Sequence, residues 1–194
     1  MLKRQTLLGK FQLPIFCEEG YEADDMIGTL ATRAKAKGYQ VKILSGDQDL
    51  FQLIDTDEDI KIMYVSTQYG RSGSSIKEYG VAEVYEKLEI LPSQVIDYKA
   101  LCGDTSDNIP GVKGIGKKTA VKLLDAYGDL ATIYASIEEL KGAVKKRLET
   151  GKDAADQSKF LATIITDVPV ETDLETCKLE GFNPDEVIPE LKRL

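Results

Sequence analysis

The sequence has no histidine among its 194 residues. Histidine is the side chain that most readily exchanges a proton near neutral pH and is a frequent metal ligand. Any acid–base or metal chemistry in this chain therefore falls to carboxylates, lysines, tyrosines and water.

Long apolar runs and cysteines are also scarce. No apolar stretch is long enough to span a bilayer, and Met1–Lys10 is charged and amphipathic, unlike a signal peptide. The three cysteines, Cys17, Cys102 and Cys177, are odd in number, far apart and without metal-ligand spacing. We therefore expect reduced thiols in a cytoplasmic protein that has no membrane partner.

An excess of positive charge is missing from the whole chain but present in one segment. The formal net charge is −8, which by itself argues against a nucleic-acid partner. Residues 110–152, however, carry 9 Lys/Arg and 5 Asp/Glu, a net charge of +4. Because local charge sets the attraction for phosphate, this segment is the candidate contact surface for a polyanion.

Strand and helix patterns alternate in the first half of the chain. Short apolar runs predict buried strands at Pro14–Cys17, Val41–Ser45 and Ile60–Val65, and a 3.6-residue apolar stripe predicts a helix at Asp24–Lys37. Gly and Ser residues predict a turn at Gln68–Ser75. This alternation indicates an α/β core with a parallel sheet, over residues 1–92.

From Ser93 onward the pattern is almost entirely helical, and we assign residues 93–194 to a second, helical domain. Gly128 and Gly151 are placed as helix stops. The expected helices after the first hundred residues are Lys117–Tyr127, Leu130–Ala135, Ile137–Leu148 and Ala154–Thr166.

The segment Cys102–Leu124, CGDTSDNIPGVKGIGKKTAVKLL, combines two kinds of chemistry. Asp104 and Asp107 are three residues apart, so their carboxylates repel each other unless a cation lies between them. A glycine-rich turn then leads into a helix N-terminus, whose free amides suit a phosphate. The plain alternative is a helix–helix connection. The expected DNA-backbone contacts are Gly111, Lys113, Gly114, Gly116, Lys117, Lys118 and Lys122.

Two further groups of acids lie upstream. Glu22, Asp24 and Asp25 stand at the start of a predicted helix, and Asp47 and Asp49 follow a predicted buried strand. Taken alone, the first group is explained by N-capping and the second by a turn. Together with Asp104 and Asp107 they give seven carboxylates from three loops, which suit two Mg²⁺ or Mn²⁺ ions.

The motifs EADD at Glu22–Asp25, GDQD at Gly46–Asp49 and GDTSDNIPGVKGIGKKTA from Gly103 resemble, in order and spacing, the 5′ nuclease (flap endonuclease) family. The resemblance extends from about Gly20 to Pro169 and is closest to the 5′→3′ exonuclease domain of bacterial DNA polymerase I. It implies a PIN-like, resolvase-like core and a helix–hairpin–helix that holds K⁺. It also implies metal ligands at Glu22, Asp24, Asp25, Asp47, Asp49, Asp104 and Asp107, all but Glu22 also being catalytic.

The implied reaction is divalent-metal-dependent hydrolysis of DNA with 5′ ends, flaps or nicks. In the family, the nuclease domain begins before the residue equivalent to Met1, and that region supplies further acids. We therefore expect an N-terminally truncated chain that is weakly active or inactive by itself. Its expected partners include the missing nuclease segment and a polymerase domain. The alternatives are a catalytically incomplete DNA-binding fragment and a PIN-like ribonuclease.

Overall fold

A computed structural model describes residues 2–67, 74–179 and 181–193 of the chain. The chain forms two compact units, one comprising Met1–Leu30 and Ile165–Leu194, the other Ala31–Ile164. No helix of the described residues is long and apolar enough to cross a bilayer. The three cysteines are free thiols, and the cytoplasmic location stays a prediction.

The unit built from the two ends of the chain is mainly helical. It contains α1 (Leu2–Lys10), the first turns of α2 (Ala23–Ala36), the 3₁₀ helix η4 (Leu174–Cys177) and α9 (Pro184–Arg193). Helices α1 and α9 contact each other, with the Phe11 and Phe182 rings 4.9 Å apart. A small core of Met26, Val168 and Val170 forms under α2.

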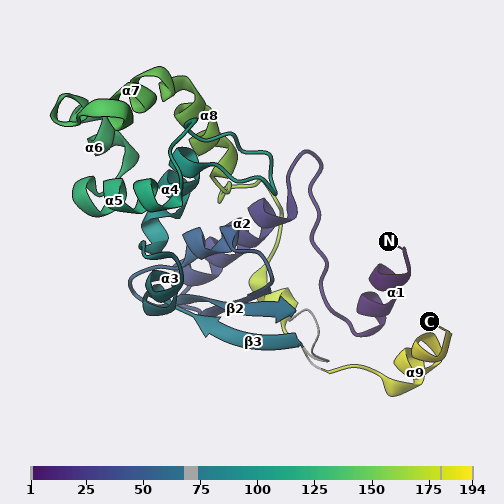
Figure 1. Cartoon of the computed structure of the whole chain (residues 1–194). Helices are drawn as coiled ribbons and strands as arrows, with labels where there is room; N and C mark the ends of the chain where they lie inside the picture. Colours follow the sequence, from purple (N-terminus) through teal and green to yellow (C-terminus); the bar gives the residue numbers. More distant parts are fainter. Residues whose placement is uncertain (1, 68–73, 180, 194) are drawn as a thin grey trace. The chain divides into compact units, whose positions relative to one another are not determined.

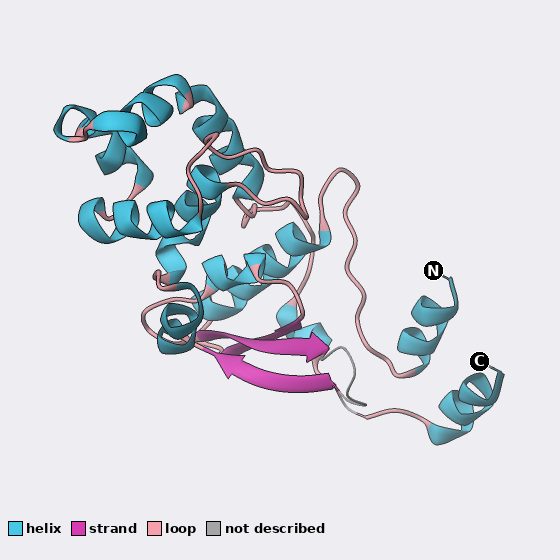
Figure 2. Cartoon of the chain, in the orientation of Figure 1, coloured by secondary structure: helices cyan, strands magenta, loops and turns pink. Residues whose placement is uncertain are grey.

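Residues Ala31–Ile164 begin with a three-stranded sheet in the order β1 (Val41–Ser45), β2 (Ile60–Thr67), β3 (Ser74–Tyr79) (Figures 1 and 2). Strands β1 and β2 are parallel, as predicted, with Ile43 opposite Ile62. Strand β3 is antiparallel to β2, with Thr67 opposite Ser74, so the sheet is mixed. The α/β class is confirmed, and the predicted turn at Gln68–Ser75 falls mostly on residues 68–73, outside the described residues.

Two elements of this region differ from the sequence expectation. Pro14–Cys17 is not a strand: it carries no strand hydrogen bonds and Ile15 is 48% exposed. A short apolar run alone does not distinguish a buried strand from an exposed loop, and Pro14 lacks an N–H for a ladder. Strand β3 was missed because its sequence, SSIKEY, has a single aliphatic residue, Ile76.

The helical part of this unit follows α3 (Val81–Leu88) and η2 (Pro92–Gln94). Figure 1 shows its helices grouped together. They pack around Leu101, Leu124, Ile133 and Leu148, which are at most 1% exposed. The predicted helix Ile137–Leu148 is interrupted, because Gly142 has φ +66° and starts a new helix. The helices are α4 (Val95–Cys102), α5 (Lys117–Tyr127), α6 (Leu130–Ala135), η3 (Ile137–Glu139), α7 (Gly142–Thr150) and α8 (Lys152–Ala162).

Helix α4 is the centre of this group, and it buries charge as well as apolar surface. Asp97 is 5% exposed; its Oδ2 accepts the Leu130 backbone N–H at 2.9 Å and its Oδ1 lies 2.7 Å from Lys159 Nζ. These contacts join α4 to the start of α6 and to α8. A buried carboxylate is tolerated because one oxygen accepts a hydrogen bond and the other forms an ion pair with an ammonium.

The glycine turn between α4 and α5 packs tightly against the end of α4. Gly111 has φ +61°, and a Cβ there would lie 2.2 Å from the Gly103 backbone nitrogen. Its N–H donates to Ser158 Oγ at 2.9 Å. Gly114 also has positive φ, +86°, whereas Gly116 is extended with φ −98° and has open space at its Cβ position. The turn thus uses positive φ at Gly111 and Gly114 but not at Gly116.

We predict that Gly111→Ala lowers the free energy of unfolding by about 2 kcal/mol or more, since it combines backbone strain with a clash against backbone atoms. Urea denaturation measures this effect. Gly116→Ala is the matched control and should change the value by less than about 0.5 kcal/mol. Equal losses in the two variants would contradict the close packing of Gly111.

Candidate metal centre and nucleic-acid interface

Three of the predicted carboxylates come together in the unit Ala31–Ile164. Asp49 begins the 3₁₀ helix η1 (Asp49–Leu53), and Asp104 and Asp107 lie in the loop after α4. One oxygen from each of the three lies within 4.8 Å of the others. Clustered carboxylate oxygens are the donors that Mg²⁺ and Mn²⁺ prefer, so this set fits a divalent cation.

The loop that carries Asp104 and Asp107 is fixed by its own hydrogen bonds. Asp104 and Ile109 exchange two backbone hydrogen bonds, of 2.9 and 2.8 Å, which close the loop. Asp104 Oδ1 accepts the Ser106 N–H at 2.9 Å and also the Ser106 hydroxyl. Asn108 takes φ +56°, which asparagine adopts more readily than most residues. The loop therefore presents both acids on one side.

A lysine lies among these acids, and the sequence interpretation missed it. The Lys99 ammonium donates to Asp49, lies 2.9 Å from Asp104 Oδ2 and 3.3 Å from Asp107 Oδ2. Its side chain is only 8% exposed. The available signal was a single lysine inside the apolar helix IDYKALC, because a lysine is rarely buried without a partner.

The environment shifts the pKa values of two of these acids in opposite directions. Burial is the largest effect on Asp49 and raises its pKa to about 6, although Lys99 opposes it. Burial also acts on Asp104, but hydrogen bonds from Lys99 and Ser106 outweigh it and hold the pKa of Asp104 at about 2. Burial lowers the pKa of the Lys99 ammonium, but the hydrogen bonds that the ammonium donates to Asp104 and Asp49 outweigh burial, so this pKa is raised.

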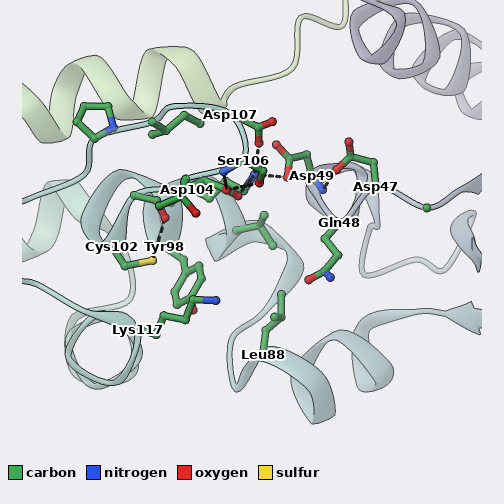
Figure 3. A pocket seen from close by; sticks show the side chains of 17 residues that line it. Asp47, Gln48, Asp49, Leu88, Tyr98, Cys102, Asp104, Ser106, Asp107 and Lys117 are labelled. Atoms are coloured by element: carbon green, nitrogen blue, oxygen red, sulfur yellow. Dashed lines mark hydrogen bonds and ion pairs between the residues drawn. The ribbon is translucent and has the colours of Figure 1, made fainter. Parts of the chain in front are cut away.

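The carboxylates line one wall of a cavity of about 620 Å³ (Figure 3). Asp47 lies beside Asp49 in the same wall. Its Oδ1 accepts the Asp49 N–H at 2.9 Å, which forms the predicted turn. Tyr98, Cys102 and Lys117 line another part of the cavity. The cavity thus has carboxylates on one wall and the first residue of α5 on another.

The remaining predicted acids, Glu22, Asp24 and Asp25, lie at the start of α2 in the other unit. Asp25 Oδ2 accepts the Glu22 N–H at 3.1 Å, which is a helix-capping contact, and its Oδ1 accepts the Ile165 N–H at 2.8 Å. The capping interpretation therefore holds for Asp25. A metal role for these three acids stays a prediction.

A second acidic group, Asp55, Asp57 and Asp59, also places its oxygens within 4.8 Å of one another. Lys35 contacts Asp55 and lies 3.3 Å from Asp57. Asp55 Oδ1 accepts the Asp59 N–H at 3.0 Å. These contacts account for the group as a capped turn at the start of β2.

The predicted phosphate-binding lysines surround the glycine turn. Lys113, Lys117, Lys118 and Lys122 are all exposed, and none makes an ion pair with another described residue. Gly116, the N-cap of α5, has no side chain to cap the first-turn amides. Exposed amides and lysines together suit phosphate oxygens.

Arg147 of α7 supports this turn, a role that the sequence did not reveal. Its Nη1 donates to the Gly114 carbonyl at 2.9 Å, and a Cβ on Gly114 would lie 2.8 Å from Arg147 Nε. In the sequence, Arg147 is the last of three consecutive basic residues, Lys145 to Arg147, and nothing in that run points to the glycine turn. In the structure it holds the tip of the glycine turn.

We predict that Asp104→Asn lowers the free energy of unfolding by about 2 kcal/mol at pH 7. The folded-state pKa of Asp104, about 2, is below its ordinary value of 3.8, so its stabilisation is present above pH 4 and is lost as pH falls through 2. Urea denaturation should show the penalty roughly halved at pH 3. A penalty independent of pH would mean that the Asp104 charge is not what Lys99 and Ser106 stabilise.

Comparison with known proteins gives two family matches that together extend over most of the chain. Residues 2–89 match the family described as "5'-3' exonuclease, N-terminal resolvase-like domain" and residues 90–185 match "5'-3' exonuclease, C-terminal SAM fold". DNA polymerase I of Synechocystis sp. is 45% identical over 98% of this chain and 19% of its own length. The chain thus spans about a fifth of that relative.

Two solved structures of bacteriophage T5 nucleases have the same fold as this chain. T5 5′-exonuclease with divalent zinc ions aligns with a TM-score of 0.69 and 24% identity, over 99% of this chain and 65% of that one. A T5 flap endonuclease complex with DNA and metal ions aligns with a TM-score of 0.63 and 25% identity, over 78% of this chain and 53% of that one.

Proposed function

Because the chain belongs to the 5′-3′ exonuclease family, we propose that it is a divalent-metal-dependent 5′ nuclease domain that hydrolyses phosphodiester bonds of DNA with 5′ ends, flaps or nicks. The observation that carries the proposal is the carboxylate group of Asp49, Asp104 and Asp107, with Asp47 beside it. It lies in the same cavity as Lys117, the first residue of the helix that follows the glycine turn.

The roles follow from the geometry. Asp47, Asp49, Asp104 and Asp107 would hold Mg²⁺ or Mn²⁺, since all four offer carboxylates at one cavity wall. When bound, divalent cations generate a nucleophile from water and stabilise the charge on the leaving oxygen. Ser106 keeps the Asp104 carboxylate oriented through its two hydrogen bonds.

The glycine turn would bind the DNA backbone without reading its sequence. Lys113, Lys117, Lys118 and Lys122 attract phosphates, while the α5 N-terminus orients one of them. By the family resemblance, the backbone carbonyls of the turn would also bind a K⁺ ion. The boundary near residue 92 is supported by the two family matches, which meet between residues 89 and 90.

Cleavage of a 5′-flap DNA tests this function. With Mg²⁺ the chain should cut the flap and with EDTA it should not, while Asp104→Ala and Asp47→Ala should each lower the rate on the order of 10²-fold or more. Asp125→Ala, at an exposed position of α5, removes an acid outside the cavity and should leave the rate unchanged. Flap binding without any cleavage would favour the DNA-binding fragment, and preferential cleavage of single-stranded RNA the PIN-like ribonuclease.

A second test concerns the lysines of the turn. Replacing both Lys117 and Lys118 with Ala should weaken binding to all duplex sequences alike and lower the salt-dependence slope by about 0.9 for each lost phosphate contact. The matched double variant Lys42→Ala, Lys61→Ala removes the same charge from the sheet, where both lysines pair with Glu78. It should leave the slope unchanged. A loss confined to particular sequences would argue against a backbone clamp.

A further inference from the structure

Lys99 is the most deeply buried charge at the cavity wall. It extends from α4, and its ammonium contacts a carboxylate on η1 and two on the loop after α4. With 8% of the side chain exposed, water supplies little of its solvation. A charged lysine is stable there only because the three carboxylates surround it.

The charges do not balance. Three carboxylates and one ammonium leave a net charge of −2 if all four groups are ionised. Lys117 also lines the cavity but makes no ion pair with these acids among the described residues. Asp47, in the same cavity wall, adds a further negative charge, so the excess is at least the charge of one divalent cation. Lys99 therefore neutralises only part of the negative charge of the acids, and the rest can be neutralised by a metal ion.

The Lys99 ammonium and a divalent metal ion would bind the same carboxylate oxygens. Lys99 contacts Asp49 Oδ1, Asp104 Oδ2 and Asp107 Oδ2. A divalent ion that used these oxygens would bind them at about 2.0–2.2 Å, in the space that the ammonium takes. The metal ion must either displace the ammonium or bind the other carboxylate oxygens while the positive charge of Lys99 stays beside it. Either course weakens metal binding relative to a site without the lysine.

We infer that Lys99 is an internal counter-ion that holds Asp49, Asp104 and Asp107 together in the metal-free protein and competes with divalent cations for their oxygens. This inference rests on the proposed function, because it concerns the same carboxylates. Lys99 is thus a positioning residue. It stabilises the site before metal binds and lowers the affinity of the site for metal.

The test is calorimetric titration of Mn²⁺ into the full chain and into Lys99→Met, which keeps the length of the side chain and removes its charge. The variant should bind Mn²⁺ at least about tenfold more tightly. Its melting temperature should fall in EDTA, and Mg²⁺ should raise it more than it raises that of the unmodified chain. Lys99→Arg, which restores the charge, should return Mn²⁺ affinity toward the original value.

Lys159→Met is the matched control, since Lys159 of α8 is paired with Asp97, a buried acid of α4 that lies outside the cluster. It removes the same charge and should leave Mn²⁺ affinity unchanged. Equal or weaker Mn²⁺ binding by folded Lys99→Met would overturn the inference while leaving the metal site itself intact. If neither the unmodified chain nor Lys99→Met binds Mn²⁺, the proposed metal site is wrong as well.

Circular dichroism resolves the case in which Lys99→Met does not fold in EDTA. Folding restored by saturating Mg²⁺ would support the inference, because the divalent ion then replaces the missing ammonium. A variant unfolded in both conditions would contradict it, since its defect would not be one of charge at the carboxylates.

Discussion

Electrostatic repulsion among carboxylates is the constraint on which the candidate site depends. The fold places Asp49, at the start of η1, against the loop that holds Asp104 and Asp107. Like charges at such distances oppose folding unless a cation is present. Lys99 comes from the helix that leads directly into the acidic loop, so the packing of α4 against η1 brings the compensating charge together with two of the acids.

The acidic loop and the glycine turn are joined by backbone contacts. Gly111 approaches Gly103, which directly precedes Asp104, too closely for any Cβ. The Val112 N–H donates to the Leu101 carbonyl at 2.9 Å, fixing the turn to the last helical turn of α4. Packed backbone of this kind resists small displacements. The amides at the start of α5 therefore keep a fixed position relative to the carboxylates. The proposed reaction requires this, because the phosphodiester would be bound by the amides and hydrolysed beside the carboxylates.

Local patterns predicted much of this architecture, and their failures have physical causes. Helices Lys117–Tyr127 and Leu130–Ala135 were predicted with the observed bounds. Glycines flank the first helix at both ends, and Asp129 caps the start of the second. Strand β3 carries too few aliphatic residues to show alternation. Its place beside β2 comes from pairing between strands, which composition does not encode.

The site shows the same limit. Spacing identified Asp104 and Asp107, and a position after a strand identified Asp49, because acids at such places point to ligands. Nothing in the spacing placed Lys99 among them, since the contact with Asp49 joins residues fifty positions apart. Arg147 was equally hidden, because its contact with Gly114 depends on how α7 packs. Sequence motifs identified the acids and the glycine turn. The cations that position them, Lys99 for the acids and Arg147 for the turn, were evident only from the tertiary structure.

The separation of charge within the chain has a consequence for how DNA would be handled. The net negative carboxylate wall repels phosphate, whereas the exposed lysines of the glycine turn attract it. Attraction to the backbone thus comes from residues that need no divalent ion, and entry of the scissile phosphate into the acidic cavity requires added positive charge. Lys99 cannot supply it alone, because its single charge is already shared among three carboxylates. In the proposed function, binding and hydrolysis therefore depend on different cations: lysines for binding and metal for hydrolysis.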